Sequence, residues 1–238
     1  MPLLERVEEL IDAVIGRVDH GAQASTRDFA TRGVRVRSGV EQVAAMDLGL
    51  PLLHREFSQT RAGALLRSGA DEVHRSAIGP ESATLLYSIV RYRQPSFLLE
   101  TGTQTGISAL VIAEALHANG VGHLTSLDIR EFQRVQERQE PYLASIARFD
   151  VVQPRRVPRR IEQLAAGQID WGALMDSRNT FAHQRRELKA LMASVPPATL
   201  MVNNAEMSRA FLNSTKEAAR RGAFVSPRGN VFAVAFME

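Results

Sequence analysis

The chain has 238 residues, of which 45% are hydrophobic and 23% charged, and it contains no cysteine. This composition predicts a compact folded protein and excludes intrinsic disorder, a collagen-like repeat and a disulfide-stabilised scaffold. The formal charge of +3 comes from 29 basic residues, and all of them except Lys189 and Lys216 are arginine. We interpret the arginine excess as a compositional bias, so nucleic acid is not expected as a partner.

Nothing in the sequence predicts a membrane segment. The longest charge-free stretch covers only the 16 residues 190–205 and is interrupted by Pro196 and Pro197, so it is too short and too irregular to span a bilayer. The acidic start of the chain, with Glu5 and Glu8, does not fit a signal peptide. We therefore expect a cytoplasmic protein with no membrane partner.

The N-terminal third reads as a helical region. Apolar residues at helical spacing, among them Leu3, Val7 and Leu10, predict an amphipathic helix over residues 3–18. This helix either packs on its own domain or supports a homodimer. Residues 20–50 read as loop with a short helix, and a further helix is expected over residues 53–66. Residues 1–75 together form the predicted helical cap or dimerisation segment.

From residue 76 the pattern changes to strands alternating with helices, which is typical of a parallel sheet. A helix is expected to begin at Pro80, because proline suits the first helical turn. Expected strands cover residues 97–100, 123–129, 151–157, 171–175 and 198–202, and expected helices cover 107–118, 132–146, 181–193 and 209–221. An antiparallel hairpin closes the chain over 223–237. The predicted fold is therefore a Rossmann-like, doubly wound α/β domain over residues 76–238, with a mostly parallel sheet of seven strands.

One strand–turn–helix segment carries the chemistry. Glu100 ends a buried strand, and Gly102 and Gly106 follow in a turn that leads into a helix. Glycines in such a turn allow close approach of a ligand and of the helix, and the N–H groups exposed there attract a negative group. The next strand ends in Asp128, where an acidic side chain is placed to bind the two hydroxyls of a ribose. The glycine spacing lacks the dinucleotide fingerprint, so a nucleoside without a pyrophosphate is favoured.

The pattern Glu-x-Gly-x-x-x-Gly resembles motif I of the class I S-adenosylmethionine (SAM)-dependent methyltransferases. Together with the helix start at residues 79–81, it resembles the small metal-dependent O-methyltransferases of the catechol and caffeoyl-CoA type. The segment after the fourth predicted strand also resembles bacterial relatives that include cephalosporin-type methyltransferases. The resemblance implies that SAM is the cofactor. It assigns the SAM site to Glu100, Gly102, Thr103, Gly106, Ser108 and Asp128.

The same resemblance implies a Mg²⁺ site at Asp176, Asn203 and Asn204. The family holds its metal with an Asp after the fourth strand and an Asp-Asp or Asp-Asn pair after the fifth, and such a metal would promote deprotonation of an acceptor hydroxyl. Asn203 replaces one carboxylate of this set, and because Mg²⁺ relies on carboxylates, metal binding is expected to be weakened or lost.

The predicted catalytic residues are Asp176, His183 and Asn204. His183 lies close in sequence to Asp176 and is a candidate general base. His20 and His54, delivered by the N-terminal region, are alternatives for that role. The absence of cysteine leaves oxygen or imidazole groups as the candidate catalysts.

The sequence therefore predicts a SAM-dependent O-methyltransferase that acts on a small molecule in bacterial secondary metabolism. Two alternatives stay open. A SAM-binding protein that no longer methylates, serving as a cyclase or an interaction subunit, is supported by the incomplete metal set. An RNA methyltransferase is supported only by the basic residues. The acceptor pocket is expected to involve residues 1–75, outside the resemblance.

Overall fold

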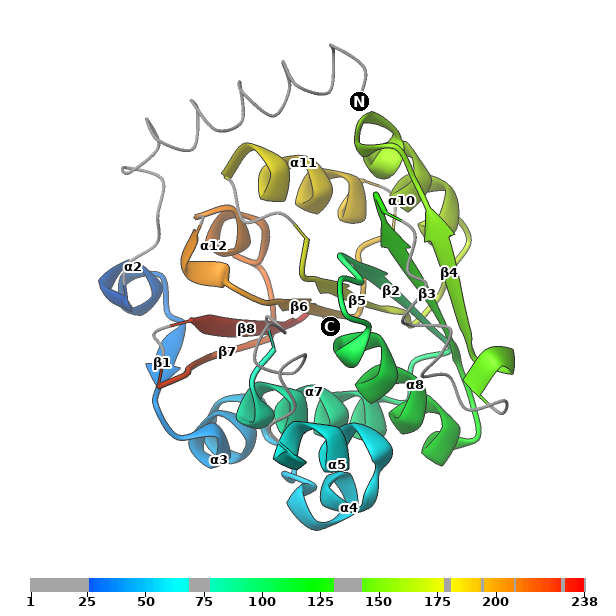
Figure 1. Ribbon diagram of the computed structural model, residues 1–238. Coiled ribbons are helices and arrows are strands. Elements are labelled where there is room, and N and C mark those ends of the chain that lie inside the picture. Colours follow the sequence, from blue (N-terminus) through cyan, green and yellow to red (C-terminus); the bar gives the residue numbers. More distant parts are fainter. Residues whose placement is uncertain are drawn as a thin grey trace.

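The computed structural model describes residues 26–68, 78–130, 143–177, 181–193, 195–207, 209–227 and 230–237. The helix expected over residues 3–18 and most of the one expected over 132–146 lie outside the described residues. Figure 1 shows a central sheet with helices packed on both of its faces. The predicted Rossmann-like α/β fold is confirmed. No helix within the described ranges combines the length and apolar character needed to cross a bilayer.

The sheet is mixed and has the order β1-β7-β8-β6-β5-β2-β3-β4. β8 runs antiparallel to both of its neighbours, and the other pairings are parallel. The chain builds outward from β2 to β4, then returns to place β5 on the other side of β2, which creates a topological switch point between β2 and β5. The strands are β1 (Arg35–Arg37), β2 (Phe97–Thr101), β3 (His123–Asp128), β4 (Ala147–Val151), β5 (Gly172–Met175), β6 (Thr199–Val202), β7 (Arg220–Val225) and β8 (Val231–Phe236).

Each central strand is apolar on both faces, because helices cover the sheet on both sides. In β2, Leu98 belongs to one hydrophobic cluster, whereas Phe97 and Leu99 belong to the cluster on the opposite face. The cluster that contains Leu98 is covered by α3 (Val40–Gln42), the π-helix η2 (Val43–Leu48), α4 (His54–Gln59), α5 (Arg61–Ser68), α7 (Pro80–Arg93) and α8 (Ile107–Asn119). The opposite cluster is covered by α2 (Thr26–Thr31), α10 (Val157–Ala165), α11 (Phe181–Leu191) and α12 (Ala210–Ser214).

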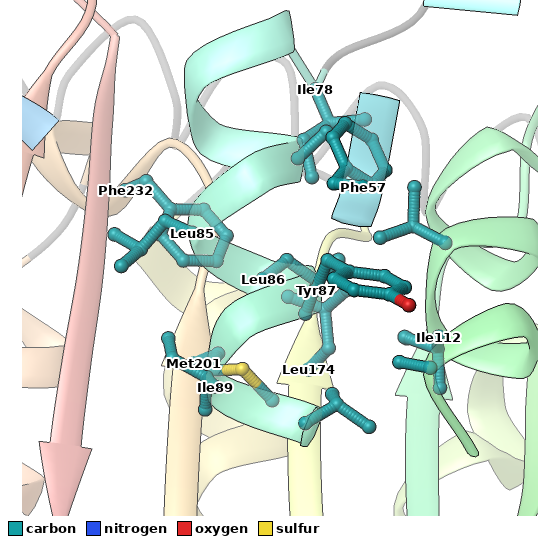
Figure 2. Close-up of a cluster of buried hydrophobic side chains, with 14 of the residues drawn as sticks. Phe57, Ile78, Leu85, Leu86, Tyr87, Ile89, Ile112, Leu174, Met201 and Phe232 are labelled. Carbon is teal, nitrogen blue, oxygen red and sulfur yellow. The ribbon is translucent and has the colours of Figure 1, made fainter. Parts of the chain in front are cut away.

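Helix α7 forms the centre of the first cluster. Proline at its first position confirms the predicted start. Figure 2 shows its side chains between the sheet and the N-terminal helices, with Leu85 near Phe232 and Tyr87 near Phe57. The rings of Phe57 and Tyr87 are 5.3 Å apart, and the Tyr87 hydroxyl donates a 2.8 Å hydrogen bond to Glu56. The helix is therefore held by apolar packing on the sheet side and by polar contacts with α4.

The N-terminal region contributes an eighth strand, so the prediction of seven strands is wrong by one. Residues 35–37 lie in the segment expected to be loop and short helix, and they pair in parallel with β7. Arg35 and Arg37 flank Val36 in this three-residue strand, a pattern too short to distinguish from a loop. The N-terminal region also contributes Phe29 of α2 to the cluster on one face of the sheet. On the other face, the buried Glu114 of α8 accepts hydrogen bonds from the N–H groups of Arg61 and Ala62 at the start of α5. Residues 26–68 thus pack on both faces of the sheet, and a domain boundary at residue 75 stays a prediction.

Two further elements differ from expectation. β4 covers Ala147–Val151 rather than 151–157, since Pro154 and Pro158 begin a short 3-10 turn and helix α10 there. The helix expected over 209–221 ends at Ser214, and β7 begins at Arg220. The guanidinium of Arg220 lies over the Phe236 ring at 4.9 Å, so a charged residue that looks like part of a polar helix face in fact packs on an aromatic ring of the neighbouring strand β8.

Candidate functional site

The predicted site residues meet at the carboxyl ends of the parallel strands, on either side of the switch point. Three backbone hydrogen bonds extend the sheet pairing just beyond the strands. They run from Gly102 N to Leu127 O at 2.8 Å, from Asp176 N to Thr101 O at 2.8 Å, and from Asn203 N to Met175 O at 3.0 Å. The fold therefore brings the motif turn, Asp176 and Asn203 to one edge. Ligands of open α/β sheets bind at such switch points.

The turn between β2 and α8 depends on its two glycines. Gly102 has φ +90°, and a Cβ atom there would lie 2.3 Å from the Asp176 carbonyl oxygen and 2.6 Å from Ser177 Cα. Gly106 has φ +75° at the cap of α8 and is joined to Thr103 by a 2.7 Å backbone hydrogen bond. The sequence predicted Gly102 for ligand approach, and the structure adds a packing reason, because this turn lies directly against the end of β5.

Asp128 stands at the end of β3 and faces the motif turn. Its Oδ2 accepts a 3.1 Å hydrogen bond from the Gln104 backbone N–H, and its Oδ1 accepts bonds of 2.6 and 3.1 Å from the N–H groups of Ile129 and Arg130. A carboxylate offers about four lone-pair sites, so acceptor capacity remains for a ligand. The turn and β3 thus orient the side chain expected to bind ribose hydroxyls.

Beneath the turn lies a buried chain of polar side chains. Thr103 and Ser126 hydroxyls are 2.6 Å apart, and Ser126 in turn donates to Glu100 Oε2. Burial is the main cause that raises the pKa of Glu100 to about 7, while the hydroxyls of Ser108 and Ser126 act to lower it and the Asp128 charge acts to raise it. Within the described residues, the other oxygen, Glu100 Oε1, has no hydrogen-bond partner at normal geometry. The side chain of Thr103 therefore points into the protein, and only its backbone faces the turn.

Across the switch point, Asp176 is paired with an amide. Asn203 Nδ2 donates a 2.9 Å hydrogen bond to Asp176 Oδ1. Burial is the main cause that raises the pKa of Asp176 to about 8, while the Asn203 amide acts to lower it and the charge of Glu100 acts to raise it. Among the residues that the structure describes, no Lys, Arg or His forms an ion pair with Glu100 or Asp176. The edge is therefore an acidic site suited to a positively charged ligand.

The predicted metal ligands do not fit a Mg²⁺ site in this arrangement. Asn203 directs its amide nitrogen at Asp176, and Asn204 Oδ1 accepts a 2.8 Å hydrogen bond from Asn230 Nδ2. This leaves a single carboxylate for a hard cation that prefers several oxygen ligands. A search of the described residues finds no group of three or more His, Cys, Asp or Glu side chains that could hold a metal. The Asn203 amide instead satisfies the carboxylate by hydrogen bonding.

His183 lies in the first turn of α11 and contacts two side chains through one ring nitrogen. Its Nε2 is 3.0 Å from Glu187 Oε1 and 3.1 Å from Ser177 Oγ. Glu187 is buried, and it also accepts hydrogen bonds from Ser177 and Thr101. The structure thus joins His183 to the ends of β2 and β5. His54, in contrast, is half exposed on α4 and pairs with the exposed Glu41.

Several site residues were not found from the sequence. Glu187 could have been suspected because it stands four residues after His183 on a predicted helix, the spacing of side chains on one helix face. Gln184, which donates to the Asn204 carbonyl at 3.4 Å, and Asn230 gave no such signal. Their roles depend on the packing of distant segments. Residues that support Asn204 are therefore visible only in the fold.

A separate hollow of about 730 Å³ lies between α11 and α12. It is lined by Arg185, Leu188, Lys189, Met192, Ala193, Ala210, Asn213 and Ser214. None of the predicted site residues lines it. The candidate site accordingly rests on the carboxyl edge of the sheet.

Comparison with known proteins identifies the segment that contains this edge. Residues 99–204 match the family model described as a methyltransferase domain. This segment runs from β2 to the end of β6 and includes every predicted site residue. No curated protein matches the sequence significantly.

Solved structures share the fold at low sequence identity. The O-methyltransferase TomG from Streptomyces achromogenes, solved with SAM, gives a TM-score of 0.57 at 19% identity over 80% of this chain and 98% of that one. An O-methyltransferase from Bacillus cereus in complex with S-adenosylhomocysteine (SAH) gives 0.58 at 14% identity, over 83% and 100%. A putative caffeoyl-CoA O-methyltransferase from Staphylococcus aureus gives 0.57 at 12% identity, over 77% and 95%. The domain match and the fold confirm the resemblance predicted from the motif.

Proposed function

We propose that this chain, which carries a methyltransferase domain, transfers a methyl group from SAM to an oxygen atom of a small molecule. The observation that carries the proposal is the meeting of Asp128, the Gly102 turn and Asp176 at one switch point. Nucleoside ligands bind at such points in doubly wound folds. The neighbours TomG and the Bacillus cereus enzyme, solved with SAM and SAH, support the cofactor and the oxygen acceptor.

The charges of the site fit SAM. Glu100 and Asp176 are buried carboxyl groups whose pKa values rise to about 7 and about 8. A bound cation favours the ionised form of both groups, since opposite charge lowers a carboxyl pKa. SAM would supply an ammonium group and a methyl group bonded to a positively charged sulfur. The buried Glu100 Oε1, which lacks a partner among the described residues, is the atom most in need of such a ligand.

Each side chain has a role that follows from its position. Asp128 would hold the ribose hydroxyls, and the N-terminal end of α8, a helix of 13 residues, would face the carboxylate of the methionine portion. Asp176 and Asn204, at the ends of β5 and β6, would orient the acceptor hydroxyl. His183, on α11, would accept its proton. Positioning of this kind accounts for a large part of catalysis in group transfer.

Methyl transfer in this protein is proposed to proceed without Mg²⁺. At 2.9 Å from Asp176 Oδ1 stands the amide donor of Asn203, in place of the second carboxylate that a metal would need. The acceptor hydroxyl then has to lose its proton to a side chain. This separates the chain from the metal-dependent relatives that its motifs resemble.

A small-molecule acceptor is favoured over RNA because many arginines are engaged within the protein. Arg37 pairs with Asp47 at 2.6 Å, Arg91 with Glu56 at 2.6 Å, and Arg160 with Asp150 at 2.6 Å. Guanidinium groups in such pairs are neutralised and do not form a phosphate-binding surface. A cytoplasmic location, a homodimer and a place in secondary metabolism stay proposals, the last in keeping with the TomG neighbour, which is involved in tomaymycin synthesis.

The experiment is a methyl-transfer assay with SAM and catechol as the probe acceptor, followed by mass spectrometry for SAH and the methylated product. We expect both products in EDTA, with no gain on adding Mg²⁺. Asp176→Asn is expected to lose turnover while it still binds SAH. Loss of turnover in EDTA that Mg²⁺ restores would contradict the metal-free route.

The non-methylating alternative has its own signature. Its support is the same amide that replaces a carboxylate at Asn203. A protein of this kind would bind SAH but release none from SAM with catechol or with a panel of phenols and alcohols. For the RNA alternative, binding to an RNA duplex would weaken steeply with salt, whereas no such binding is expected.

A further inference from the structure

Glu187 is a buried carboxylate that accepts hydrogen bonds from three side chains. Its Oε2 accepts from Ser177 Oγ at 2.5 Å and from Thr101 Oγ1 at 3.0 Å, and its Oε1 lies 3.0 Å from His183 Nε2. Its side chain is 2% exposed. A carboxyl group surrounded by donors is the ionised, acceptor-only form. The geometry therefore places an acceptor carboxylate next to the imidazole of His183.

This contact determines which ring nitrogen of His183 carries the proton. Ser177 and Glu187 both meet Nε2, so the group is not a serine–histidine–carboxylate relay, which needs the two partners on opposite ring nitrogens. Donation of Nε2–H to Glu187 leaves Nδ1 as the unprotonated nitrogen. The lone pair of Nδ1 is then free to accept a proton from another molecule.

The location fits a role in the proposed reaction. Ser177 directly follows Asp176, and its Cα lies 2.6 Å from where a Cβ on Gly102 would stand. Thr101, the other donor to Glu187, directly precedes Gly102. The His183–Glu187 pair thus borders the motif turn. The His183 side chain keeps 15% of its surface exposed, whereas that of Glu187 keeps 2%.

We propose that His183 Nδ1 is the general base for the acceptor hydroxyl and that Glu187 is the positioning residue that fixes its tautomer and balances its charge. The inference rests on the proposed function. The hydroxyl proton moves to Nδ1 while the oxygen forms a bond to the methyl carbon. The bond between methyl and sulfur breaks, and its electron pair stays on sulfur to give neutral SAH. The imidazolium is stabilised by Glu187 and later releases its proton to water.

Electrostatics make the expected effect specific. Among the residues that the structure describes, Glu187 is the ionisable group in direct contact with His183. Asp176 adjoins Ser177 at the end of β5, and Arg186 of α11 donates to the Ala182 carbonyl. The charge of Glu187 favours the imidazolium, so removal of that charge favours the neutral ring. Glu187→Gln keeps the shape and an acceptor oxygen. It changes the charge with little change in packing.

The first measurement is the pH dependence of catechol methylation. In Glu187→Gln, the acid limb of the kcat profile should move to lower pH by about one unit, and kcat should fall about tenfold while KM changes less than threefold. In His183→Ala, kcat should fall at least about 100-fold and be partly restored by added imidazole. An unmoved acid limb in Glu187→Gln, or no loss of kcat in His183→Ala, would overturn the proposal. The contacts of Glu187 with His183, Ser177 and Thr101 would then serve only the packing of α11.

The second measurement does not need an acceptor. Nitrogen-15 NMR of the histidine rings should show His183 protonated at Nε2 at high pH, with a smaller fraction of imidazolium near neutral pH in Glu187→Gln than in the wild type. Protonation at Nδ1 would overturn the tautomer assignment. The matched control is Glu41→Gln in the exposed pair with His54, whose side chains are 68% and 54% exposed. It should leave the kcat profile unchanged.

These two arms separate the inference from the function on which it rests. If the wild type releases no SAH with catechol or the phenol panel, the proposed function fails. The assignment of His183 as the base then fails with it, even if NMR shows His183 protonated at Nε2. If SAH forms but the kcat profile is insensitive to Glu187→Gln, the function stands and the base lies elsewhere, with Asp176 as the next candidate.

Discussion

The two halves of the carboxyl edge are built in different ways. The half proposed to bind the cofactor, called here the cofactor half, uses residues from one strand–turn–helix–strand unit, where Asp128 of β3 faces the Gly102–Gly106 turn. The half proposed to bind the acceptor, called here the acceptor half, comprises Asp176, His183, Asn203 and Asn204. It depends on side chains from distant segments, because Asn230 contacts Asn204 and Glu187 contacts His183. A site for a shared cofactor can therefore be encoded locally. A site for a particular acceptor is assembled from long-range contacts.

The largest effect on stability is expected where the two halves touch, at the contact of Gly102 with Asp176. Gly102→Ala places a Cβ 2.3 Å from the Asp176 carbonyl oxygen in a backbone with φ +90°. Because backbone has to move on both sides, we expect a loss of about 4 kcal/mol or more in the free energy of unfolding, measured with urea. Gly167→Ala is the control, since Gly167 has φ +76° with open space around it, and it should lose only about 1 kcal/mol. Equal losses would show that the halves are not in contact.

Asn203→Asp tests whether the acceptor half has lost a metal. The amide donor 2.9 Å from Asp176 becomes a second carboxyl group, and like charges at that distance destabilise the fold, by about 3 kcal/mol in EDTA at pH 8. For a chain of this size we expect Tm to fall by about 6–12 °C. Mg²⁺ should recover part of the loss in the variant and leave the wild type unchanged. A wild type stabilised by Mg²⁺ would contradict the distinction from metal-dependent relatives.

The two buried carboxyl groups make the stability of the cofactor-free protein depend on pH. Their folded pKa values, about 7 for Glu100 and about 8 for Asp176, lie above their ordinary values. Between the ordinary value and the folded value of each group, the carboxyl is ionised in the unfolded chain and protonated in the folded chain. The contribution of each group to the free energy of unfolding is therefore fully present below its ordinary pKa, and it is lost as pH rises through its folded pKa. Each group contributes a slope of up to about 1.4 kcal/mol per pH unit. Asp176→Asn should flatten the curve from urea titrations at pH 5 to 8, and an unchanged slope would count against burial of Asp176.

The smallest effect is expected within the cofactor half. The Thr103 hydroxyl points to Ser126 at 2.6 Å, away from the turn surface. Thr103→Val should therefore cost about 1 kcal/mol of stability through the lost hydrogen bond. Its Kd for SAH should change less than threefold, as measured by calorimetry. A tenfold weaker Kd would place the side chain in the cofactor site.

The cofactor half could be predicted because it rests on local rules. Strand β2, the glycine turn and α8 follow from apolar runs, from backbone conformations that glycine accepts, and from a helix cap. Asp128 follows from the end of the next strand. Even here the sequence did not show that Gly102 packs on Asp176, since that contact joins residues 74 positions apart.

The acceptor half could be predicted only in part. Asp176, Asn203 and Asn204 were placed at strand ends, but the direction of the Asn203 amide depends on its neighbour across the sheet. β1 was missed because a three-residue edge strand has no readable period. The early end of α12 was missed because Arg220 and Arg221 continue a polar pattern that β7 also satisfies. In each case tertiary contacts override local pattern.

The most direct test of the central claim is calorimetric titration with SAH. The wild type should bind about one SAH per chain, and Asp128→Ala should raise Kd at least about tenfold, which corresponds to about 1.4 kcal/mol. Glu162→Ala, an exposed carboxylate on α10, should bind as the wild type does. No binding by the wild type, or the same Kd in Asp128→Ala, would contradict the account.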